Sequence, residues 1–211
     1  MANMEEGMLP VAKEFQGFFL LITLILIGFY FVTGLPNYYL WGLWLLFLLF
    51  IRDFRREIPP IPQAVISPVD GRILETIETQ DPFLNRLTTR YTISQFVWGE
   101  FNVHSPVEGR VEHLWVQNTE KQKKCLAFCI RSDEEGDVVV EIELNSPLQH
   151  ASTHIHPGER VGQGKRCGFA AMGCMVHVYL PKTAKVVGQM NDKALAGRDI
   201  LANLISLKNT D

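Results

Sequence analysis

The chain has 211 residues, a formal net charge of −3 at pH 7 and 47% hydrophobic residues. This length accommodates one ordinary domain with an appendage, and the negative charge argues against a nucleic-acid partner held mainly by phosphate contacts. The apolar residues are unevenly distributed, since no charged residue occurs from Phe15 to Ile51. We therefore expect an N-terminal membrane anchor over residues 1–57 and a separate domain over residues 58–211.

The uncharged region contains two apolar segments, residues 15–33 and 38–51. A turn is expected between them, because Gly34 tolerates a positive φ and Pro36 cannot continue a helix. A bilayer span needs about 20 residues, so we predict a helical membrane hairpin whose second span uses residues 35–54 with some bilayer thinning. A single span with an interfacial helix, or a hydrophobic hairpin buried in a soluble protein, are the alternatives. A cleaved signal peptide fits poorly, because the sequence has only a weak basic start and no small-residue cleavage site.

Three arginines, Arg52, Arg55 and Arg56, follow the second apolar segment directly. Short arginine-rich flanks stay on the cytoplasmic side, which predicts a protein of the cytoplasmic membrane whose soluble domain faces the cytosol. In that reducing compartment the cysteines are expected to remain thiols, and thiols ordinarily ionise near pH 8.5.

Short β-rich segments replace helical periodicity after the proline-rich linker, residues 58–62. Strands are predicted at residues 65–66, 91–93, 110–116, 125–130, 138–144, 175–180 and 184–187. A helix is expected only at residues 83–90 and near the C-terminus. The pattern predicts a mainly β domain, a compact sandwich or barrel with one core.

Two internal echoes indicate a duplicated β motif. Residues 67–73, Ser-Pro-Val-Asp-Gly-Arg-Ile, recur as residues 105–111, Ser-Pro-Val-Glu-Gly-Arg-Val. Residues 158–164 are loosely similar to residues 187–201, which form the second internal repeat. Two copies are too few for an open solenoid, so we predict a flattened barrel or sandwich hybrid, as in biotinyl and lipoyl carriers.

Four landmarks occur in order along the chain: residues 50–56, residues 66–71, Phe-Asn-Val-His at residues 101–104, and the segment 168–181 around Gly173-Cys174. Together they resemble the short, membrane-anchored bacterial and archaeal phosphatidylserine decarboxylases. In that family a Gly-Ser bond cleaves itself and the serine becomes a pyruvoyl group. In this chain the serine position is Cys174.

The resemblance implies a zymogen that cleaves itself between Gly173 and Cys174 and forms a pyruvoyl cofactor from Cys174. It would then be a carboxy-lyase that converts phosphatidylserine, or a related serine phospholipid of the membrane, to phosphatidylethanolamine. By the same resemblance, Asp70 orients His104, and His104 takes the proton from residue 174. A homo-oligomer, or an association of the two cleavage fragments, is also implied.

The chain departs from the family pattern in two places. His104 is followed at once by Ser105-Pro106, so either three residues are deleted after a correctly matched histidine, or Phe101 occupies the usual histidine position. The family's basic pair near the substrate site is represented by Thr153-His154, the candidate substrate-binding residues. This replacement weakens phosphate binding, because the guanidinium group of arginine matches the geometry of phosphate better than either side chain does.

No metal site is expected, because the cysteines lack a C-x-x-C pair and the histidines near residue 154 lack an acidic or cysteine partner. Two other function classes stay open. One is a non-catalytic, uncleaved homologue acting as a membrane-anchored lipid-binding or interaction module. The other is a carrier domain modified at Lys193, which lies in a lipoyl-like Asp-Lys-Ala context.

Overall fold

The computed structural model describes residues 13–34, 38–50, 61–118, 124–133 and 136–204. The chain divides into two compact units, residues 1–55 and residues 56–211. Each unit is described by itself.

The N-terminal unit contains two helices, α1 (Lys13–Thr33) and α2 (Tyr38–Phe50). Helix α1 ends as the sequence predicts, because Gly34 adopts a φ of +64° and its N–H donates to the Tyr30 carbonyl at 2.9 Å. Within the described residues, however, neither helix combines the length and hydropathy that crossing a bilayer requires. Helix α2 has 13 residues, about 20 Å at 1.5 Å per residue, against a hydrocarbon core of about 30 Å. The predicted membrane-spanning hairpin is therefore not supported.

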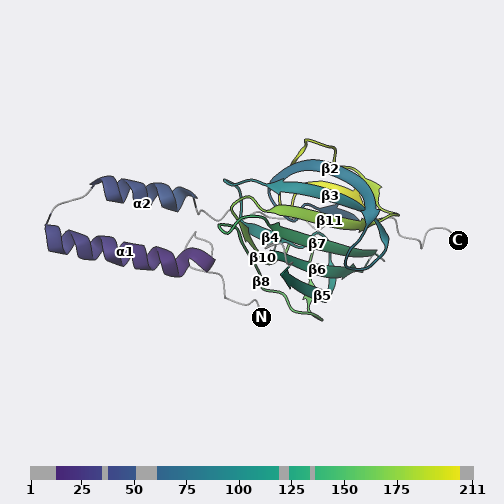
Figure 1. Ribbon diagram of the computed structural model, residues 1–211, viewed down its shortest axis with the longest axis horizontal. Helices are drawn as coiled ribbons and strands as arrows, with labels where there is room; N and C mark the ends of the chain where they lie inside the picture. The colour runs from purple at the N-terminus through teal and green to yellow at the C-terminus, as the bar shows by residue number, and fades with distance from the viewer. Residues whose placement is uncertain (1–12, 35–37, 51–60, 119–123, 134–135, 205–211) are drawn as a thin grey trace. The chain divides into compact units, whose positions relative to one another are not determined.

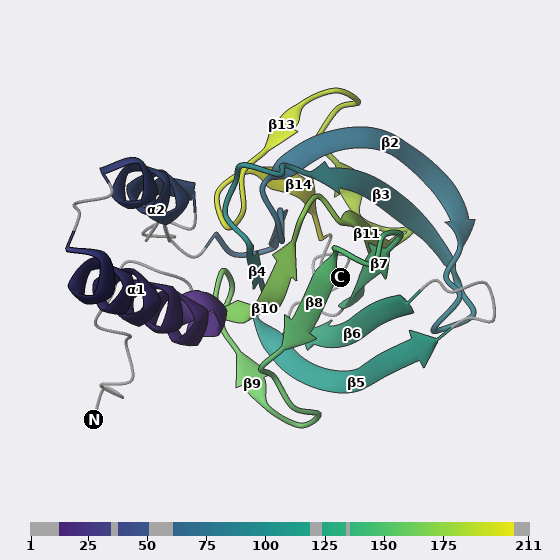
Figure 2. The same cartoon turned by 60° about the vertical axis from the view of Figure 1, so that its left-hand side comes forward.

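The second unit is mainly β, as predicted (Figure 1). Its strands are β1 (Ala64–Ile66), β2 (Gly71–Gln80), β3 (Leu87–Gln95), β4 (Asn102–His104), β5 (Gly109–Asn118), β6 (Lys124–Ser132), β7 (Gly136–Leu144), β8 (His150–Thr153), β9 (Arg160–Val161), β10 (Arg166–Ala171), β11 (Met175–Pro181), β12 (Lys185–Val186), β13 (Lys193–Ala194) and β14 (Ile200–Asn203). The largest sheet has the order β13-β2-β3-β11-β7-β6-β5-β9 and curls into a half-barrel (Figures 1 and 2). Two three-stranded sheets, β4-β10-β8 and β1-β14-β12, complete the unit.

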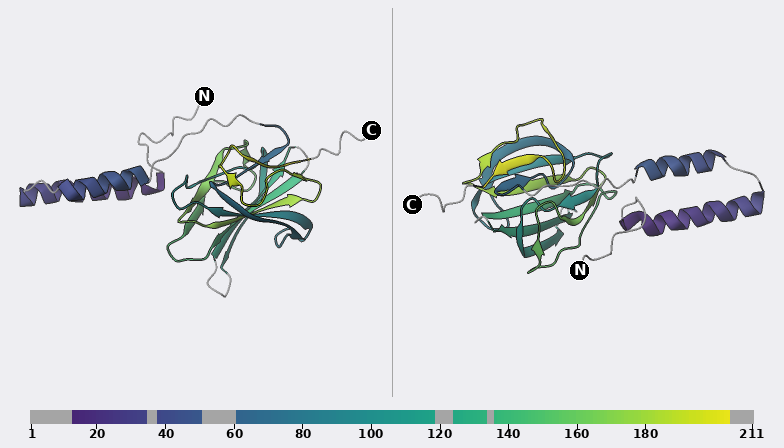
Figure 3. Two further views of the ribbon diagram at one scale, coloured as in Figure 1. Left: turned by 90° about the horizontal axis from the view of Figure 1, so that it is seen from above. Right: turned by 180° about the vertical axis from the view of Figure 1, so that it is seen from behind.

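The central strands of the large sheet are rich in β-branched and aromatic residues, which suit a pleated surface, and some of them alternate in burial. In β11, for example, Val176 and Val178 are fully buried whereas Met175 and His177 are only partly covered. Most buried apolar side chains form one extensive core, and a smaller cluster is built around Cys129, Val139 and Tyr179. Figure 3 shows the backbone of the curled sheet from above and from behind. Each strand predicted from the sequence overlaps an observed strand.

The predicted helix at residues 83–90 is wrong. Asp81 instead starts a turn, since its Oδ1 accepts the N–H groups of Phe83 and Leu84 at 2.8 Å and 3.3 Å. Strand β3 then begins at Leu87 and pairs with both β2 and β11. Its run of threonines with Tyr91 and Ile93 suits a pleated, half-buried surface better than a helix.

The duplicated motif is present in the structure. Ser67 Oγ donates to the Val69 carbonyl at 2.7 Å, and Ser105 Oγ donates to the Val107 carbonyl at 2.6 Å. Each copy then enters a long strand, β2 or β5, with a bulge shortly after its start. The flanking strands correspond too, since β13 pairs with the start of β2 as β9 pairs with the start of β5. Residues 158–164 thus correspond to residues 191–197. The second predicted repeat therefore starts at residue 191 and not at residue 187.

Candidate functional site

The Gly173-Cys174 bond lies in the tight connection between β10 and β11. Strand β10 belongs to the sheet β4-β10-β8 and β11 to the large sheet, so this connection joins two sheets. Met172 and Gly173 adopt left-handed φ angles of 67° and 71°. Glycine accepts such an angle readily, whereas methionine is strained by it, at a cost of roughly 1–2 kcal/mol. Cys174 therefore follows a strained turn in the backbone.

The thiol of Cys174 is buried, and its Sγ lies 3.1 Å from the Ala171 carbonyl oxygen. Burial raises the pKa of this thiol to about 11, although the hydrogen bond to Ala171 opposes the shift. Cys174 therefore carries a neutral thiol near pH 7, whereas the sequence alone suggests a thiol that ionises more readily.

Two glutamine side chains contact the peptide bond that precedes Cys174. Gln95 is buried, and its Oε1 accepts the Cys174 N–H at 3.2 Å while its Nε2 donates to the Ala170 carbonyl at 2.7 Å. Gln149 Nε2 donates to the Gly173 carbonyl oxygen at 2.8 Å. Sequence reasoning missed both residues, because no motif marks them and each reaches the turn from a distant part of the chain.

Asp70 is buried in the turn before β2. Its Oδ1 accepts the Ala196 N–H at 2.7 Å, and its Oδ2 accepts the Glu100 N–H at 3.2 Å. The N–H of Phe96, the residue after Gln95, donates to the Asp70 carbonyl at 2.9 Å. Asp70 is thus bonded at two points to the segment 95–100, which also contacts Cys174.

The counterpart of Asp70 in the second copy of the motif is Glu108, and its setting is different. Glu108 is exposed and forms an ion pair of 3.4 Å with Arg160 on the surface. The same position of the motif therefore carries a surface carboxylate in one copy and a buried one beside the Gly173-Cys174 turn in the other.

His104 is buried, and both of its ring nitrogens have close partners. Nδ1 lies 2.7 Å from the Gly164 carbonyl oxygen, and Nε2 lies 2.8 Å from Oε1 of the buried Glu100. A carbonyl oxygen only accepts, so Nδ1 donates and carries a proton. Nε2 faces the Glu100 carboxylate, so both ring nitrogens of His104 are engaged in hydrogen bonds.

The register of β4 against β10 places His104 opposite Arg166, at the start of β10. Phe101 lies near the other end, where its carbonyl accepts the Ala170 N–H at 2.8 Å. Of the two residues that the sequence offers for the family histidine position, Phe101 is therefore closer to the turn along β10. Glu100 connects the predicted pair, since its N–H bonds to Asp70 and its carboxylate to His104.

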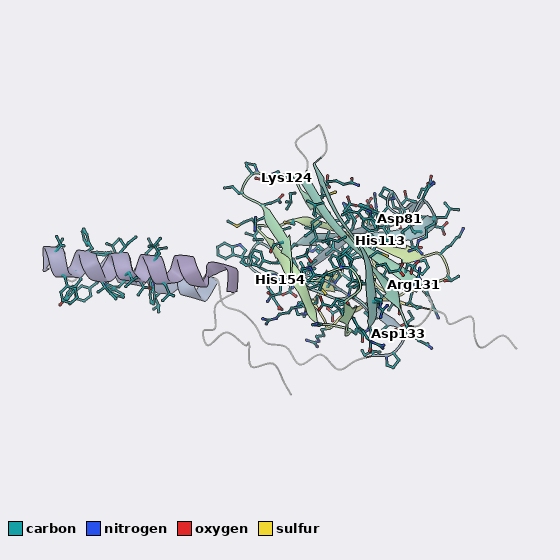
Figure 4. The ribbon with its side chains drawn as sticks, turned by 90° about the horizontal axis from the view of Figure 1, so that it is seen from below. Asp81, His113, Lys124, Arg131, Asp133 and His154 are labelled. Carbon is teal, nitrogen blue, oxygen red and sulfur yellow. The ribbon has the colours of Figure 1, made fainter. Side chains whose placement is uncertain are left out.

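The candidate substrate-binding residues lie at the far end of β8. Thr153 is opposite Gly168, and its Oγ1 donates to the Cys167 carbonyl at 2.9 Å. His154 follows on the exposed surface, well apart from the region of Asp81 and Arg131 in Figure 4. His150, at the other end of β8, is opposite Ala171 and is thus nearer the turn.

In the part of the chain that the structure describes, no cluster of three or more His, Cys, Asp or Glu side chains is arranged to hold a metal ion.

Fold and site together define a mainly β protein with a buried nucleophile directly after a turn that is strained at Met172 and ends at Gly173, an arrangement suited to attack on the protein's own peptide bond. A family model described as phosphatidylserine decarboxylase matches residues 43–202. The phosphatidylserine decarboxylase proenzyme of Nitrosomonas eutropha is 36% identical over 184 residues, covering 81% of this chain and 82% of the relative. The protein of the same name from Cupriavidus metallidurans is 32% identical over 202 residues, covering 89% and 90%. Comparison with solved structures found no significant match. The chain belongs to the phosphatidylserine decarboxylase family.

Proposed function

We propose that this protein is a phosphatidylserine decarboxylase that cleaves itself between Gly173 and Cys174 and uses a pyruvoyl group formed from Cys174. The substrate is phosphatidylserine or a related serine phospholipid, and the product is the ethanolamine lipid. The observation that carries the proposal is the Gly173-Cys174 turn, where a buried thiol follows a peptide bond held by side-chain amides at both its oxygen and its nitrogen. The family and the relatives named as proenzymes support the same reading.

Self-cleavage begins when Cys174 Sγ attacks the Gly173 carbonyl carbon. The Sγ–C bond forms, the C–N bond breaks and the thiol proton passes to the Cys174 nitrogen, which gives a thioester and an amine. Loss of the Cα proton and cleavage of the Cβ–S bond then release the first fragment as a Gly173 thiocarboxylate. Hydrolysis then replaces the nitrogen of residue 174 by the oxygen of water. The nitrogen leaves as ammonia, and residue 174 remains as the pyruvoyl group. Once formed, that group would supply a carbonyl that accepts the electron pair left on the substrate carbon when carbon dioxide departs.

Proton transfer in this scheme needs a base, because the Cys174 thiol is neutral near pH 7. We assign this role to Asp70 and His104, with Glu100 between them. The buried carboxylate of Asp70 is bonded to the segment that contacts Cys174, and Glu100 connects it to the His104 imidazole. Thr153 and His154 remain the proposed contacts for the lipid phosphate.

Two loops that contact the Gly173-Cys174 turn carry exposed apolar side chains, which suit access to a bilayer. The loop that packs against Gly173 carries Val97 and Trp98, which are 42% and 78% exposed. The loop that holds Gln149 carries Leu148, which is 75% exposed. We propose that these loop tips contact the cytosolic face of the cytoplasmic membrane, with the exposed apolar residues of α1 as a second lipid contact that requires no span.

The decisive experiment is mass spectrometry of the purified full-length chain after incubation with phosphatidylserine vesicles. We expect a C-terminal fragment that starts with a blocked residue 174, carries a borohydride-reducible carbonyl and ends at Asp211, together with ethanolamine lipid. Cys174→Ala should stay full-length and folded, whereas Cys174→Ser, which restores the family residue, should cleave faster. A persistent full-length chain in both the wild type and Cys174→Ser, with no lipid product, would contradict the proposal.

A second candidate function is a non-catalytic lipid-binding module of the same family. The observations that favour it are the neutral, buried thiol and the occupied ring nitrogens of His104. Such a protein would bind the same vesicles while remaining uncleaved, so the intact mass separates the two functions.

Membrane contact through the loop tips is tested by vesicle sedimentation. Trp98→Ser should weaken binding to anionic phospholipid vesicles about tenfold or more, since burying a large apolar side chain contributes roughly 1.5–3 kcal/mol. The control is Leu87→Ser, because Leu87 is 66% exposed at the opposite end of β3 from the turn. Equal effects of the two substitutions would contradict contact through this surface.

A further inference from the structure

We infer that two glutamines act directly on the reacting peptide bond: Gln149 stabilises the oxyanion that forms on Gly173, and Gln95 holds the departing nitrogen of Cys174. This inference rests on the proposed self-cleavage at this bond. It assigns catalytic roles to residues that contact both reacting ends of the amide.

The orientation of the Gln149 amide is determined by its partners. Its Oε1 accepts the backbone N–H groups of Asn145 and Ser146 at 2.6 Å and 3.1 Å, and these groups can only donate. Its Nε2 therefore faces the Gly173 and Met172 carbonyl oxygens at 2.8 Å and 3.4 Å, which can only accept. The loop 145–149 thus fixes an N–H donor on the carbonyl that Cys174 attacks.

Attack by Sγ converts the Gly173 carbonyl oxygen into an oxyanion. A donor already at 2.8 Å needs no rearrangement, and its hydrogen bond strengthens as negative charge develops. Removal of one such donor in other enzymes slows the reaction about 10²–10³-fold. Gln149 has the position and the chemistry of an oxyanion donor.

Gln95 acts on the opposite end of the bond. Before the C–N bond breaks, the nitrogen of Cys174 takes up the thiol proton, and the positively charged nitrogen that results is a stronger donor than the amide. Gln95 Oε1, at 3.2 Å from this nitrogen, is an acceptor suited to it, and Gln95 Nε2 is anchored on the Ala170 carbonyl. The main-chain N–H of Gln95 also donates to the Cys174 carbonyl at 3.0 Å, which holds residue 174 in place while Gly173 leaves.

Gln149→Glu provides the sharpest test. The carboxylate keeps an acceptor for the N–H groups of Asn145 and Ser146, so the loop retains its bonds, but it has no N–H and places negative charge beside the oxyanion. Gln149→Met removes the donor without adding charge. We expect both variants to cleave at least about 100-fold more slowly than the wild type, with melting temperatures close to that of the wild type.

The matched control is Gln163→Leu. Gln163 also uses both ends of its amide on the backbone, accepting from the Ile61 N–H at 2.7 Å and donating to the Ala64 carbonyl at 2.6 Å. Its loss should leave the cleavage rate unchanged. Hydroxylamine, which intercepts a thioester, should be added to all samples, so that fragment formation reports the acyl shift alone.

The outcomes separate the two proposals. If the wild type cleaves, and both Gln149→Glu and Gln149→Met cleave within about threefold of its rate, the oxyanion role is overturned and the proposed function stands. No fragment from either the wild type or Cys174→Ser, with hydroxylamine present, would overturn the proposed function and this inference with it. Slow cleavage by folded Gln149 variants and normal cleavage by Gln163→Leu support the inference.

Discussion

Cys174 combines two properties that oppose each other. Its sulfur belongs to the residue directly after the carbonyl that it attacks in the proposed reaction, yet burial raises the pKa of the thiol to about 11, so that only a small fraction is thiolate at neutral pH. The thiolate is the nucleophilic form. The supply of thiolate is therefore expected to limit the acyl shift in the wild type.

The pH dependence of self-cleavage follows from this pKa. Between about pH 7 and about pH 9 the thiolate fraction rises roughly tenfold per pH unit, because both values lie below the pKa of the thiol. The rate of fragment formation, followed by mass spectrometry, should rise by the same factor. Cys174→Ser should lack this dependence, since a serine hydroxyl does not titrate in this range. In this scheme Asp70 and His104, the proposed base, accept the proton of the ionising thiol and pass it to solvent before attack. A flat profile for the wild type would show instead that they take the proton only during attack, and would contradict the predicted pH dependence.

The pH series should stop near pH 9, because other buried thiols limit the stability of the fold. Burial raises the pKa of Cys129 and of Cys167 to about 12, well above the pKa of an exposed thiol. A pKa raised on folding contributes stability that is fully present below the unfolded value and is lost as pH rises through the folded one. We therefore expect the melting temperature to fall above about pH 9, and Cys129→Ala and Cys167→Ala to reduce that fall. An unchanged melting temperature up to about pH 11 would contradict the expected loss of stability.

At the scale of elements, the sequence predicted the strands and the duplication better than the site. The strands β5, β6, β7 and β11 are recognisable because their own residues are apolar or alternate in polarity, and the repeat of residues 67–73 is visible without any structure. Strand β3 was partly missed because its first half is polar, and its pairing with β2 and β11 decides its conformation. Gln95 and Gln149 could not be found, since only the pairing of distant segments brings them to the Gly173-Cys174 turn.

The duplicated motif also predicts which glycines the fold cannot replace. Gly71 begins β2 and Gly109 begins β5, and at both positions an added Cβ would overlap a carbonyl oxygen of the neighbouring strand, that of Ser94 or Arg131. Gly162 has open space at its Cβ position. Gly109→Ala should lower the free energy of unfolding by about 1–3 kcal/mol, measured by urea denaturation, whereas Gly162→Ala should change it by less than about 0.5 kcal/mol. Similar values for the two variants would show that the strand spacing at β5 adjusts freely.

At the scale of the whole domain, the Gly173-Cys174 bond divides the chain within its core. The segment after Cys174 contributes β11, which lies between β3 and β7 in the large sheet. It also contributes β13, which pairs with β2, and β14, which pairs with β1. Val176, Val178 and Leu180 of β11 are fully buried. The proposed cleavage would therefore remove one covalent link, and we expect it to leave the strand pairing and the core in place.

We accordingly expect the two fragments to remain one particle after self-cleavage. The completely processed protein should elute from a size-exclusion column at the volume of the uncleaved Cys174→Ala variant, and its two fragments should separate only in denaturant. Val178→Asp, which places a charge in the core on β11, provides the contrast, because an unpaired buried charge costs several kcal/mol or more. If that variant is processed at all, its fragments should separate in native buffer. Dissociation of the wild-type fragments under native conditions would mean that the bond at Gly173 itself holds β11 in the sheet, and the site could not then function after its own cleavage.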